Sequence, residues 1–261
     1  MSDDIVLTRR EGAVGVLTFN RPEELNTLNM PMMRAMEQAL DTLESDPQVR
    51  VIVVTGADDR AFMAGGDIRD LANRRPTGWY DEFGKTVHQV FARFENCDKP
   101  TVAAINGWAL GGGMEFMLCI DLRLMAAEAR IGLPEIKLGL FPGGGGSQRL
   151  MRQIPLCQAK KLMFTGERLD AAAALALGLV NEVLPRADLM TRTMALAAQI
   201  ATMSPQTLKL LKHSMRHGAQ MSLDQALAYE RAMVAVVFDH PDSKEGCEAF
   251  LQRRTPRFGA D

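Results

Sequence analysis

The arrangement of apolar residues along the first half of the chain predicts strands that alternate with helices. Residues 13–20 (AVGVLTFN), 51–55 (VIVVT) and 101–106 (TVAAIN) are β-branched runs that end at turn residues, a pattern typical of buried strands. Between the first two runs, apolar residues recur at three- and four-residue spacing. This predicts an amphipathic helix capped by Asn29, with Pro31 in its first turn. Strands alternating with helices indicate an α/β fold.

The last third of the chain has a different pattern. From about residue 187 it reads as helices only, with cap signals at Ser204, which precedes Pro205, and at Ser222. We therefore expect two parts: a core of residues 1–199 that carries the functional site, and a helical region of residues 200–261.

Composition and charge exclude several classes of protein. Of 261 residues, 47% are apolar and 24% charged, as in ordinary globular proteins. The net charge is 30 − 32 = −2, which gives no electrostatic case for a nucleic-acid or membrane partner. The four cysteines are too far apart for a zinc or disulfide pattern, so we expect reduced thiols. The acidic N-terminus has no apolar signal segment, and no apolar run could span a bilayer. A cytoplasmic protein is expected.

Three glycine-rich turns are candidates for ligand binding: residues 64–67 (AGGD), 111–113 (GGG) and 143–146 (GGGG). Glycine allows the backbone to approach a ligand closely, and free N–H groups at the start of a helix favour negative charge. Any one of these turns alone is better explained as a tight turn. None continues as GxGxxG or as GK[ST], so the sequence excludes the common nucleotide-binding loops.

Two glutamates next to these turns are candidates for acid–base chemistry. Glu115 follows the second turn, and Glu135 follows Pro134, a favoured first-turn residue. Both lie among apolar residues, where burial raises the pKa of a carboxyl and suits it to proton transfer near neutrality. Each alone also fits a first-turn glutamate favoured by the helix dipole. Asp67 fits a helix cap, and no GxSxG motif surrounds Ser147.

The order of these segments resembles one known family. Residues 61–68 (AFMAGGDI), 104–115 (AINGWALGGGME) and 133–146 (LPEIKLGLFPGGGG) resemble three successive motifs of the crotonase (enoyl-CoA hydratase/isomerase) family. The likeness covers essentially the whole chain. It implies the crotonase fold of repeated β-β-α turns, with a C-terminal helical region that assembles homotrimers, often paired into homohexamers.

The resemblance also implies an activity. It predicts hydration of a trans-2-enoyl-CoA, in which Glu115 deprotonates the water that attacks C3 and Glu135 delivers a proton to C2. Backbone N–H groups of Ala64 and Gly112 would form the oxyanion hole for the enolate. No metal is implied, and coenzyme A enters only as part of the substrate. Further substrate contacts would come from the turns, namely Leu25, Asn26, Ala64, Gly65, Gly66, Asp67, Ile68 and Gly143.

Some residues depart from the pattern of close hydratases. Glu23 and Glu24 stand where a basic residue is frequent, so we expect Arg69 to take over a contact to the coenzyme A phosphates. Leu133 and Phe141 also differ from the commonest short-chain enzymes, and we expect them to reshape the acyl pocket.

Three alternatives to hydration remain. The first is other chemistry on a coenzyme A ester, such as double-bond isomerisation, dehydration of a specialised hydroxyacyl-CoA, or C–C cleavage. The second is RNA binding, which some relatives perform through a lysine-rich helix, although close lysine pairs occur here only at 160–161 and at 209 and 212. The third is a scaffolding role. If the chain is a hydratase, its pathway would be the breakdown of fatty acids (β-oxidation), amino acids or aromatic acids.

Overall fold

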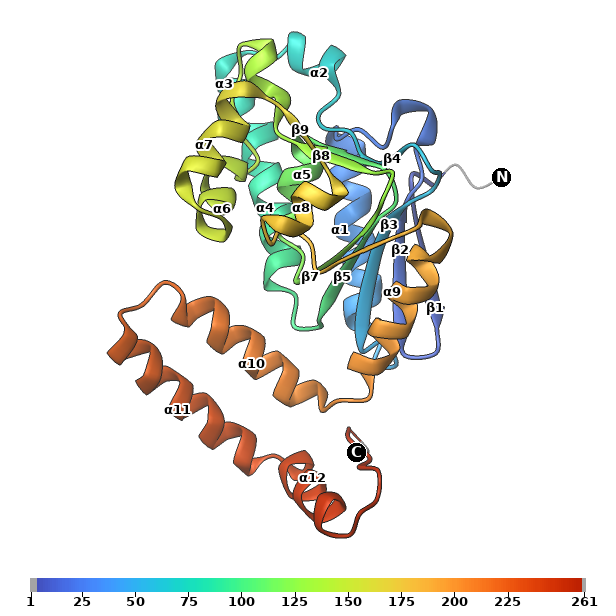
Figure 1. The fold of residues 1–261 in the computed structure, drawn as a ribbon, viewed down its shortest axis with the longest axis vertical. Helices are drawn as coiled ribbons and strands as arrows, with labels where there is room; N and C mark the ends of the chain where they lie inside the picture. Colours follow the sequence, from blue (N-terminus) through green and yellow to red (C-terminus); the bar gives the residue numbers. More distant parts are fainter. Residues whose placement is uncertain (1–3, 260–261) are drawn as a thin grey trace.

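A six-stranded sheet forms the centre of the fold in the computed structural model, which describes residues 4–259 (Figure 1). Its strands, in sheet order, are β1 Val6–Glu11, β2 Val14–Phe19, β3 Val51–Gly56, β5 Thr101–Ile105, β7 Leu122–Ala126 and β10 Glu182–Leu184. β1 and β2 form an antiparallel hairpin, and the other neighbours are parallel. The three predicted strands are confirmed as β2, β3 and β5. They read as unbroken apolar runs because they are largely buried on both faces.

A second, smaller sheet lies beside the first and was not predicted from the sequence. Its four strands, in sheet order, are β4 Ala61–Met63, β6 Trp108–Leu110, β8 Arg130–Gly132 and β9 Arg168–Asp170. The chain passes from β3 to β4, from β5 to β6 and from β7 to β8, and after each of these pairs it enters a short helix. These three successive β-β-α units confirm the expected fold class.

The predicted amphipathic helix is confirmed as α1 (Met30–Ser45). The side chain of Asn29 accepts a hydrogen bond of 2.9 Å from the backbone N–H of Met32, and Pro31 lies in the first turn. The apolar face of α1 buries Met36 and Leu40 in the core. The local sequence signals at this helix therefore agree with its packing.

The remaining helices surround the sheets. The chain from Trp79 begins as a π-helix, η2, and continues as α4. The long helix α9 packs across β2, β3, β5 and β7. The bounds of the helices other than α1 are η1 Pro22–Glu24, α2 Ile68–Ala72, α3 Pro76–Gly78, η2 Trp79–Phe83, α4 Gly84–Asn96, α5 Gly112–Met117, η3 Pro134–Leu138, α6 Gly146–Gln153, α7 Leu156–Thr165, α8 Ala171–Ala176, α9 Arg186–Ala201, α10 Pro205–Gly218, α11 Leu223–Asp239 and α12 Pro241–Leu251.

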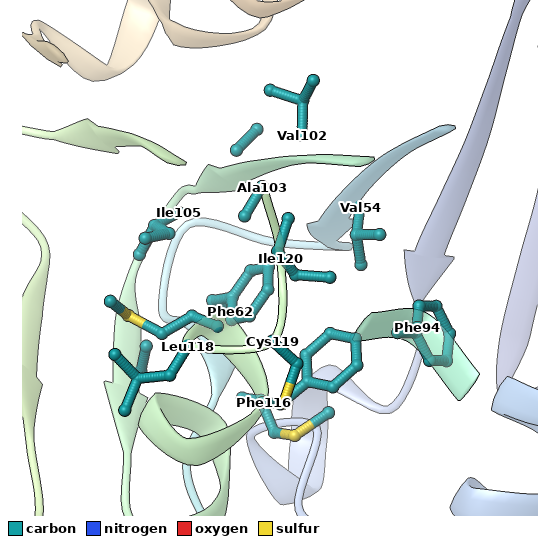
Figure 2. Packing of buried hydrophobic residues seen from close by; sticks show 14 of the residues in the cluster. Val54, Phe62, Phe94, Val102, Ala103, Ile105, Phe116, Leu118, Cys119 and Ile120 are labelled. Carbon is teal, nitrogen blue, oxygen red and sulfur yellow. The ribbon is translucent and has the colours of Figure 1, made fainter. Parts of the chain in front are cut away.

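The aromatic core gathers around Phe116, the residue directly after the candidate acid–base residue Glu115 (Figure 2). The centroid of its ring lies 4.9 Å from that of Phe94, 5.3 Å from that of Phe91 and 5.6 Å from that of Phe19. Such aromatic pairs contribute about 0.5–1.5 kcal/mol each beyond their burial. The core therefore anchors α5, the short helix that carries the glutamate.

Helices α10 and α11 form a hairpin that extends away from the rest of the molecule and is called the arm below (Figure 1). Both predicted caps are confirmed, since Ser204 accepts from the N–H of Thr207 and Ser222 forms a capping box with Gln225. Many apolar side chains of the arm are exposed, among them Leu211, Met215, Leu223, Leu227, Val234 and Phe238.

Ion pairs connect the first helix of the arm to the rest of the molecule. Lys209 lies 2.6 Å from the carboxylate of Asp98, and Lys212 lies 2.6 Å from that of Asp121. Asp121 also accepts hydrogen bonds from the N–H and hydroxyl of Thr101. The two lysines considered for RNA binding are thus each paired with an acidic residue.

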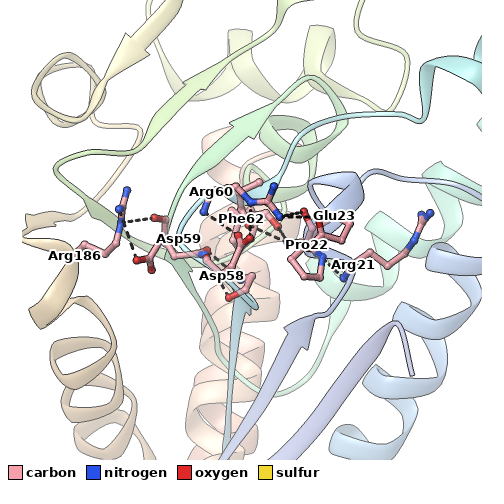
Figure 3. A network of polar contacts seen from close by, with 12 residues as sticks. Arg21, Pro22, Glu23, Asp58, Asp59, Arg60, Phe62 and Arg186 are labelled. Atoms are coloured by element: carbon pink, nitrogen blue, oxygen red, sulfur yellow. Dashed lines mark hydrogen bonds and ion pairs between the residues drawn. The ribbon is translucent and has the colours of Figure 1, made fainter. Parts of the chain in front are cut away.

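A polar network around Arg60 holds the turn before α1 (Figure 3). Its guanidinium donates to the carbonyl of Pro22 at 2.8 Å and pairs with Asp58 at 2.7 Å. It also lies 3.6 Å from the carboxylate of Glu23. The unusual acidic residue at position 23 therefore has a structural partner within the chain.

Three expectations from the sequence concern the ends and surface of the chain. Residues 1–3 of the acidic N-terminal segment lie outside the described residues. Within residues 4–259, no helix combines the length and apolar content that crossing a membrane requires. All four cysteines are free thiols, two of them buried and two exposed.

Candidate active site

The three glycine-rich turns meet at one cleft of about 570 Å³. The predicted site residues that line it are Ala64, Gly65, Gly66, Ile68, Gly112, Glu115, Glu135 and Gly143. The turns are distant in sequence, but two of them follow the parallel strands β4 and β6, and the third lies in the loop before α6. Stacking of the β-β-α units therefore brings the predicted acids and backbone donors together.

Glu115 lies in the first turn of α5 and is only 4% exposed. Its Oε1 atom accepts hydrogen bonds from the N–H of Gly144 at 2.8 Å and from that of Gly146 at 2.7 Å. Burial raises the pKa of Glu115 to about 7, and the two hydrogen bonds oppose that rise. A carboxyl with this pKa can accept a proton near neutral pH.

Glu135 lies in the first turn of η3, directly after Pro134, as expected. Burial and then the charge of Glu115 raise the pKa of Glu135 to about 7. Its buried Oε2 atom has no hydrogen-bond partner among the residues that the structure describes. An unpaired buried carboxyl oxygen fits a protonated group better than an ionised one. The charge of Glu115 therefore adds to burial in favouring the protonated form of Glu135.

The backbone donors of the first turn differ from the prediction. The N–H of Ala64 donates to the carbonyl of Leu25 at 3.0 Å, so it is not free to bind a ligand. Gly66 forms a parallel bridge with Leu28, in which Leu28 bonds to the two neighbours of Gly66 and not to Gly66 itself. The N–H of Gly66 therefore points away from Leu28, and it has no partner within residues 4–259. The hydrogen bonds thus speak against Ala64 as the donor and leave the N–H of Gly66 available among the described residues.

The second turn places Gly112, the other predicted donor, at the start of a helix. Gly112 is the first residue of α5, where backbone N–H groups have no acceptor within the helix. A Cβ atom on Gly65, whose φ of 93° favours glycine, would lie 3.8 Å from the nitrogen of Gly112. At Gly113, a Cβ atom would collide with the carbonyl of Met63. The two turns are thus pressed together, and Gly66 and Gly112 line the same cleft.

Three predicted substrate contacts lie outside the cleft. Leu25 lines a neighbouring cavity of about 300 Å³. Asn26 is fully buried, and its side-chain amide donates to the carbonyl of Ala61 at 2.9 Å, so it supports the turn from behind. Asp67 caps α2 by accepting from the N–H of Arg69 at 3.0 Å. These residues shape the site and do not line this cleft. Asp67 is confirmed as a helix cap, and contacts of the three residues to substrate stay predictions.

Sequence reasoning missed the apolar wall of the cleft. Trp79 and Phe83 come from the π-helix, and their ring centroids lie 5.3 Å apart. Val87 of α4 continues the wall, and Phe141 lines the cleft while remaining largely exposed. Leu133, the other expected acyl-pocket residue, is fully buried and absent from the lining. Trp79 and Phe83 belong to no sequence motif, and only their helical spacing could have linked them.

Three arginines that the sequence did not single out also border the cleft: Arg74, Arg75 and Arg168. Arg74 stacks over the ring of Phe83 at 4.1 Å and pairs with Asp70. Within residues 4–259, no group of three or more histidine, cysteine or acidic side chains is arranged to hold a metal ion.

Comparison with known proteins shows the family of the chain. A family model described as enoyl-CoA hydratase/isomerase matches residues 9–261. The chain is 38% identical to a short-chain-enoyl-CoA hydratase of Clostridium acetobutylicum, over 95% of each protein. It is 35% identical to a crotonyl-CoA hydratase of Syntrophomonas wolfei, over 99% of each. Among solved structures, an enoyl-CoA hydratase from Bacillus anthracis is 32% identical and superposes with a TM-score of 0.94, covering 98% of this chain and 100% of that one.

Proposed function

The chain belongs to the enoyl-CoA hydratase/isomerase family and is a hydro-lyase of enoyl-CoA thioesters. From this premise, we propose how its residues add water to a trans-2-enoyl-CoA. The observation that carries the proposal is one cleft lined by the buried carboxyl of Glu115, by the half-buried carboxyl of Glu135, and by Gly66 and Gly112. The backbone N–H groups of these two glycines have no acceptor among the described residues. The product is a 3-hydroxyacyl-CoA.

The N–H groups of Gly66 and Gly112 bind the thioester carbonyl oxygen. When a nucleophile attacks C3, the electrons of the double bond move toward this oxygen and form an enolate. Donors placed at that position bind the charged transition state more strongly than the neutral substrate. Loss of one such donor typically costs about 2.7–4 kcal/mol. Glycine at both positions lets the backbone come close to the oxygen.

The two glutamates divide the proton transfers between them. Glu115, ionised, takes a proton from the water whose oxygen bonds to C3, and Glu135, protonated, gives its proton to C2. We propose that both carboxyls act from one side of the bound substrate, which makes the addition syn. The N–H of Gly143, which lines the cleft, is a further candidate for holding the water. A proton passed from Glu115 back to Glu135 restores the starting state.

The remaining lining indicates how the substrate lies. The apolar wall of Trp79, Phe83 and Val87 receives the acyl group. Arg75 and Arg168, which border the cleft, are candidates for the coenzyme A phosphates in place of Arg69, which does not line it. Coenzyme A is part of the substrate, so no separate cofactor is needed.

We also propose that the chain assembles as a homotrimer or homohexamer. The exposed apolar side chains of the arm support this, because large apolar faces are usually covered in the assembled protein. A cytoplasmic location and a role in fatty-acid β-oxidation are proposed from the free thiols and from the enoyl-CoA substrate of the relatives.

The test is hydration of crotonyl-CoA, followed as loss of the absorbance of the conjugated thioester. Glu115→Gln and Glu135→Gln should each lower kcat by about 10²–10⁴-fold, the usual contribution of a positioned acid or base. Glu128→Gln, a change on an exposed side chain, is the control. Near-wild-type turnover in either cleft variant would contradict the two-glutamate mechanism. Isomerisation of a 3-enoyl-CoA without hydration would favour the alternative activity.

A further inference from the structure

The loop that binds Glu115 has no side chains with which to hold its own shape. It consists of four consecutive glycines, Gly143 to Gly146. Two of its N–H groups nevertheless meet the same oxygen of Glu115, at 2.8 and 2.7 Å. Glycine has the largest conformational freedom of any residue. Contacts from elsewhere in the fold must therefore fix this loop.

Arg149 of α6 provides the first of these contacts. Its Nη1 atom donates to the carbonyl of Gly144 at 3.1 Å. Its Nη2 and Nε atoms donate to the carboxylate of Glu95 at 2.8 and 3.2 Å, a two-pronged pairing that fixes the plane of the guanidinium. Glu95 belongs to α4, so the arginine connects the loop to a second helix.

His88 of α4 provides the second contact. Its Nε2 atom lies 2.7 Å from the carbonyl oxygen of Gly143, and because a carbonyl only accepts, Nε2 must carry the hydrogen. The carbonyl of Gly143 and the N–H of Gly144 belong to one peptide group. A donor on that carbonyl polarises the peptide and strengthens the hydrogen bond from its N–H to Glu115.

We propose that three side chains, Arg149, Glu95 and His88, position the Glu115 carboxylate for proton transfer. They do so by holding two carbonyls of the glycine loop, those of its first and second residues. None of the three side chains lines the cleft, so they act through the loop and not on the substrate. His88 and Glu95 are seven residues apart on α4, which places them on one face of that helix. The inference rests on the proposed role of Glu115 as the base.

The charge of Arg149 has a second effect on the same group. It lowers the pKa of Glu115 and so opposes the effect of burial. Loss of this charge should leave more of Glu115 protonated at a given pH, and protonated Glu115 cannot act as a base. The acid limb of the pH profile of kcat should then move to higher pH, an effect that a purely structural role would not produce.

The experiment measures kcat and KM for crotonyl-CoA across pH, together with the Kd of butyryl-CoA, a saturated thioester that cannot be hydrated. Arg149→Gln should lower kcat about 10–100-fold, as loss of a supporting contact does at other sites, and should raise the acid limb while the Kd stays within about twofold. Arg149→Lys keeps the positive charge but cannot bond to the loop and to Glu95 at the same time as a guanidinium does. It should return the acid limb to its wild-type position but restore only part of kcat. Arg152→Gln should match the wild type, because Arg152 lies on the same helix but, among residues 4–259, bonds only to Gln148.

His88 has its own pair of variants. His88→Leu should lower kcat about tenfold and move the acid limb to higher pH by less than Arg149→Gln does, because it weakens one hydrogen bond to Glu115 but leaves the charge of Arg149 in place. His88→Gln, which keeps a donor at a similar distance from the backbone, should recover most of the loss. If Arg149→Gln does not fold, Glu95→Gln tests the same contact more gently, with a smaller fall in kcat expected.

The outcomes separate the two proposals. A wild-type protein that does not hydrate any enoyl-CoA would overturn the proposed function itself. A wild-type protein that does so, with kcat and the acid limb unchanged in Arg149→Gln and His88→Leu, would overturn only the positioning role. A fall in kcat/KM that a weaker Kd for butyryl-CoA fully accounts for, with kcat and the acid limb unchanged, would overturn it as well.

Discussion

The raised pKa of Glu135 predicts that this active-site residue makes the folded protein less stable at high pH, and the loss of stability can be measured. Burial and the charge of Glu115 raise the pKa of its carboxyl from 4.5 to about 7. Below pH 4.5 the carboxyl is protonated in both the folded and the unfolded chain, and it costs nothing. As the pH rises from 4.5 toward 7, the unfolded chain releases its proton first, so the free energy of unfolding falls.

The size of the effect follows from that pKa. At about 1.36 kcal/mol per pH unit, a rise from 4.5 to about 7 lowers the free energy of unfolding by about 3 kcal/mol once the pH exceeds both values. Glu135→Gln removes the ionisable group at nearly constant size. Urea unfolding at fixed protein concentration, compared at about pH 5 and about pH 8.5, gives the difference between variant and wild type at each pH. Any effect of the new amide on stability that does not depend on pH is the same at both pH values, so it cancels when the two differences are compared.

We expect the difference to shift by about 2–3 kcal/mol in favour of the variant between the lower and the higher pH. Glu128→Gln, at an exposed position, should show no such shift. In a Glu115→Gln background the shift should shrink, because the charge of Glu115 causes part of the perturbation. A Glu135→Gln difference that is the same at both pH values would refute the reasoning.

Three further changes test other parts of the structure. Gly66→Pro removes the proposed oxyanion donor and should lower kcat for crotonyl-CoA about 10²–10³-fold, whereas Gly66→Ala keeps the N–H and should lose far less; equal losses would contradict this assignment. Trp79→Ala opens the apolar wall and should raise kcat/KM for a decenoyl-CoA relative to crotonyl-CoA about tenfold, and an unchanged ratio would place the acyl group elsewhere. Phe238→Lys puts a charge on the arm, where the phenylalanine is 73% exposed, and should lower the molar mass seen by light scattering; an unchanged mass would exclude this face from the assembly.

The main sheet could be predicted from the sequence because its strands are long enough to show a pattern. β2, β3 and β5 are apolar runs of five or six residues. The strands of the second sheet have three residues each, such as Ala61–Met63 and Trp108–Leu110. Three residues show no periodicity, and their pairing depends on strands that are distant in the sequence. The smaller sheet therefore appeared only in the structure.

The candidate site was predicted in part for a similar reason. Short motifs located the turns and both glutamates, because each lies beside glycines or a proline with a recognisable local role. They did not identify the free donor of the first turn. Whether Ala64 or Gly66 has a free N–H depends on hydrogen bonds to Leu25 and Leu28, which come from another part of the chain. Trp79 and Phe83 reach the cleft through a π-helix, which local patterns do not distinguish from an α-helix.

The arm is joined to the rest of the molecule by charges at its first helix, and this has a consequence for local motion. The pairs Lys209–Asp98 and Lys212–Asp121 weaken as salt screens them, whereas the aromatic core around Phe116 does not. In an isolated subunit the arm should therefore open as one unit before the sheet unfolds. Backbone amides of α10 and α11 should exchange their hydrogens faster as salt rises or as the protein is diluted, while those of β3 and β5 remain protected.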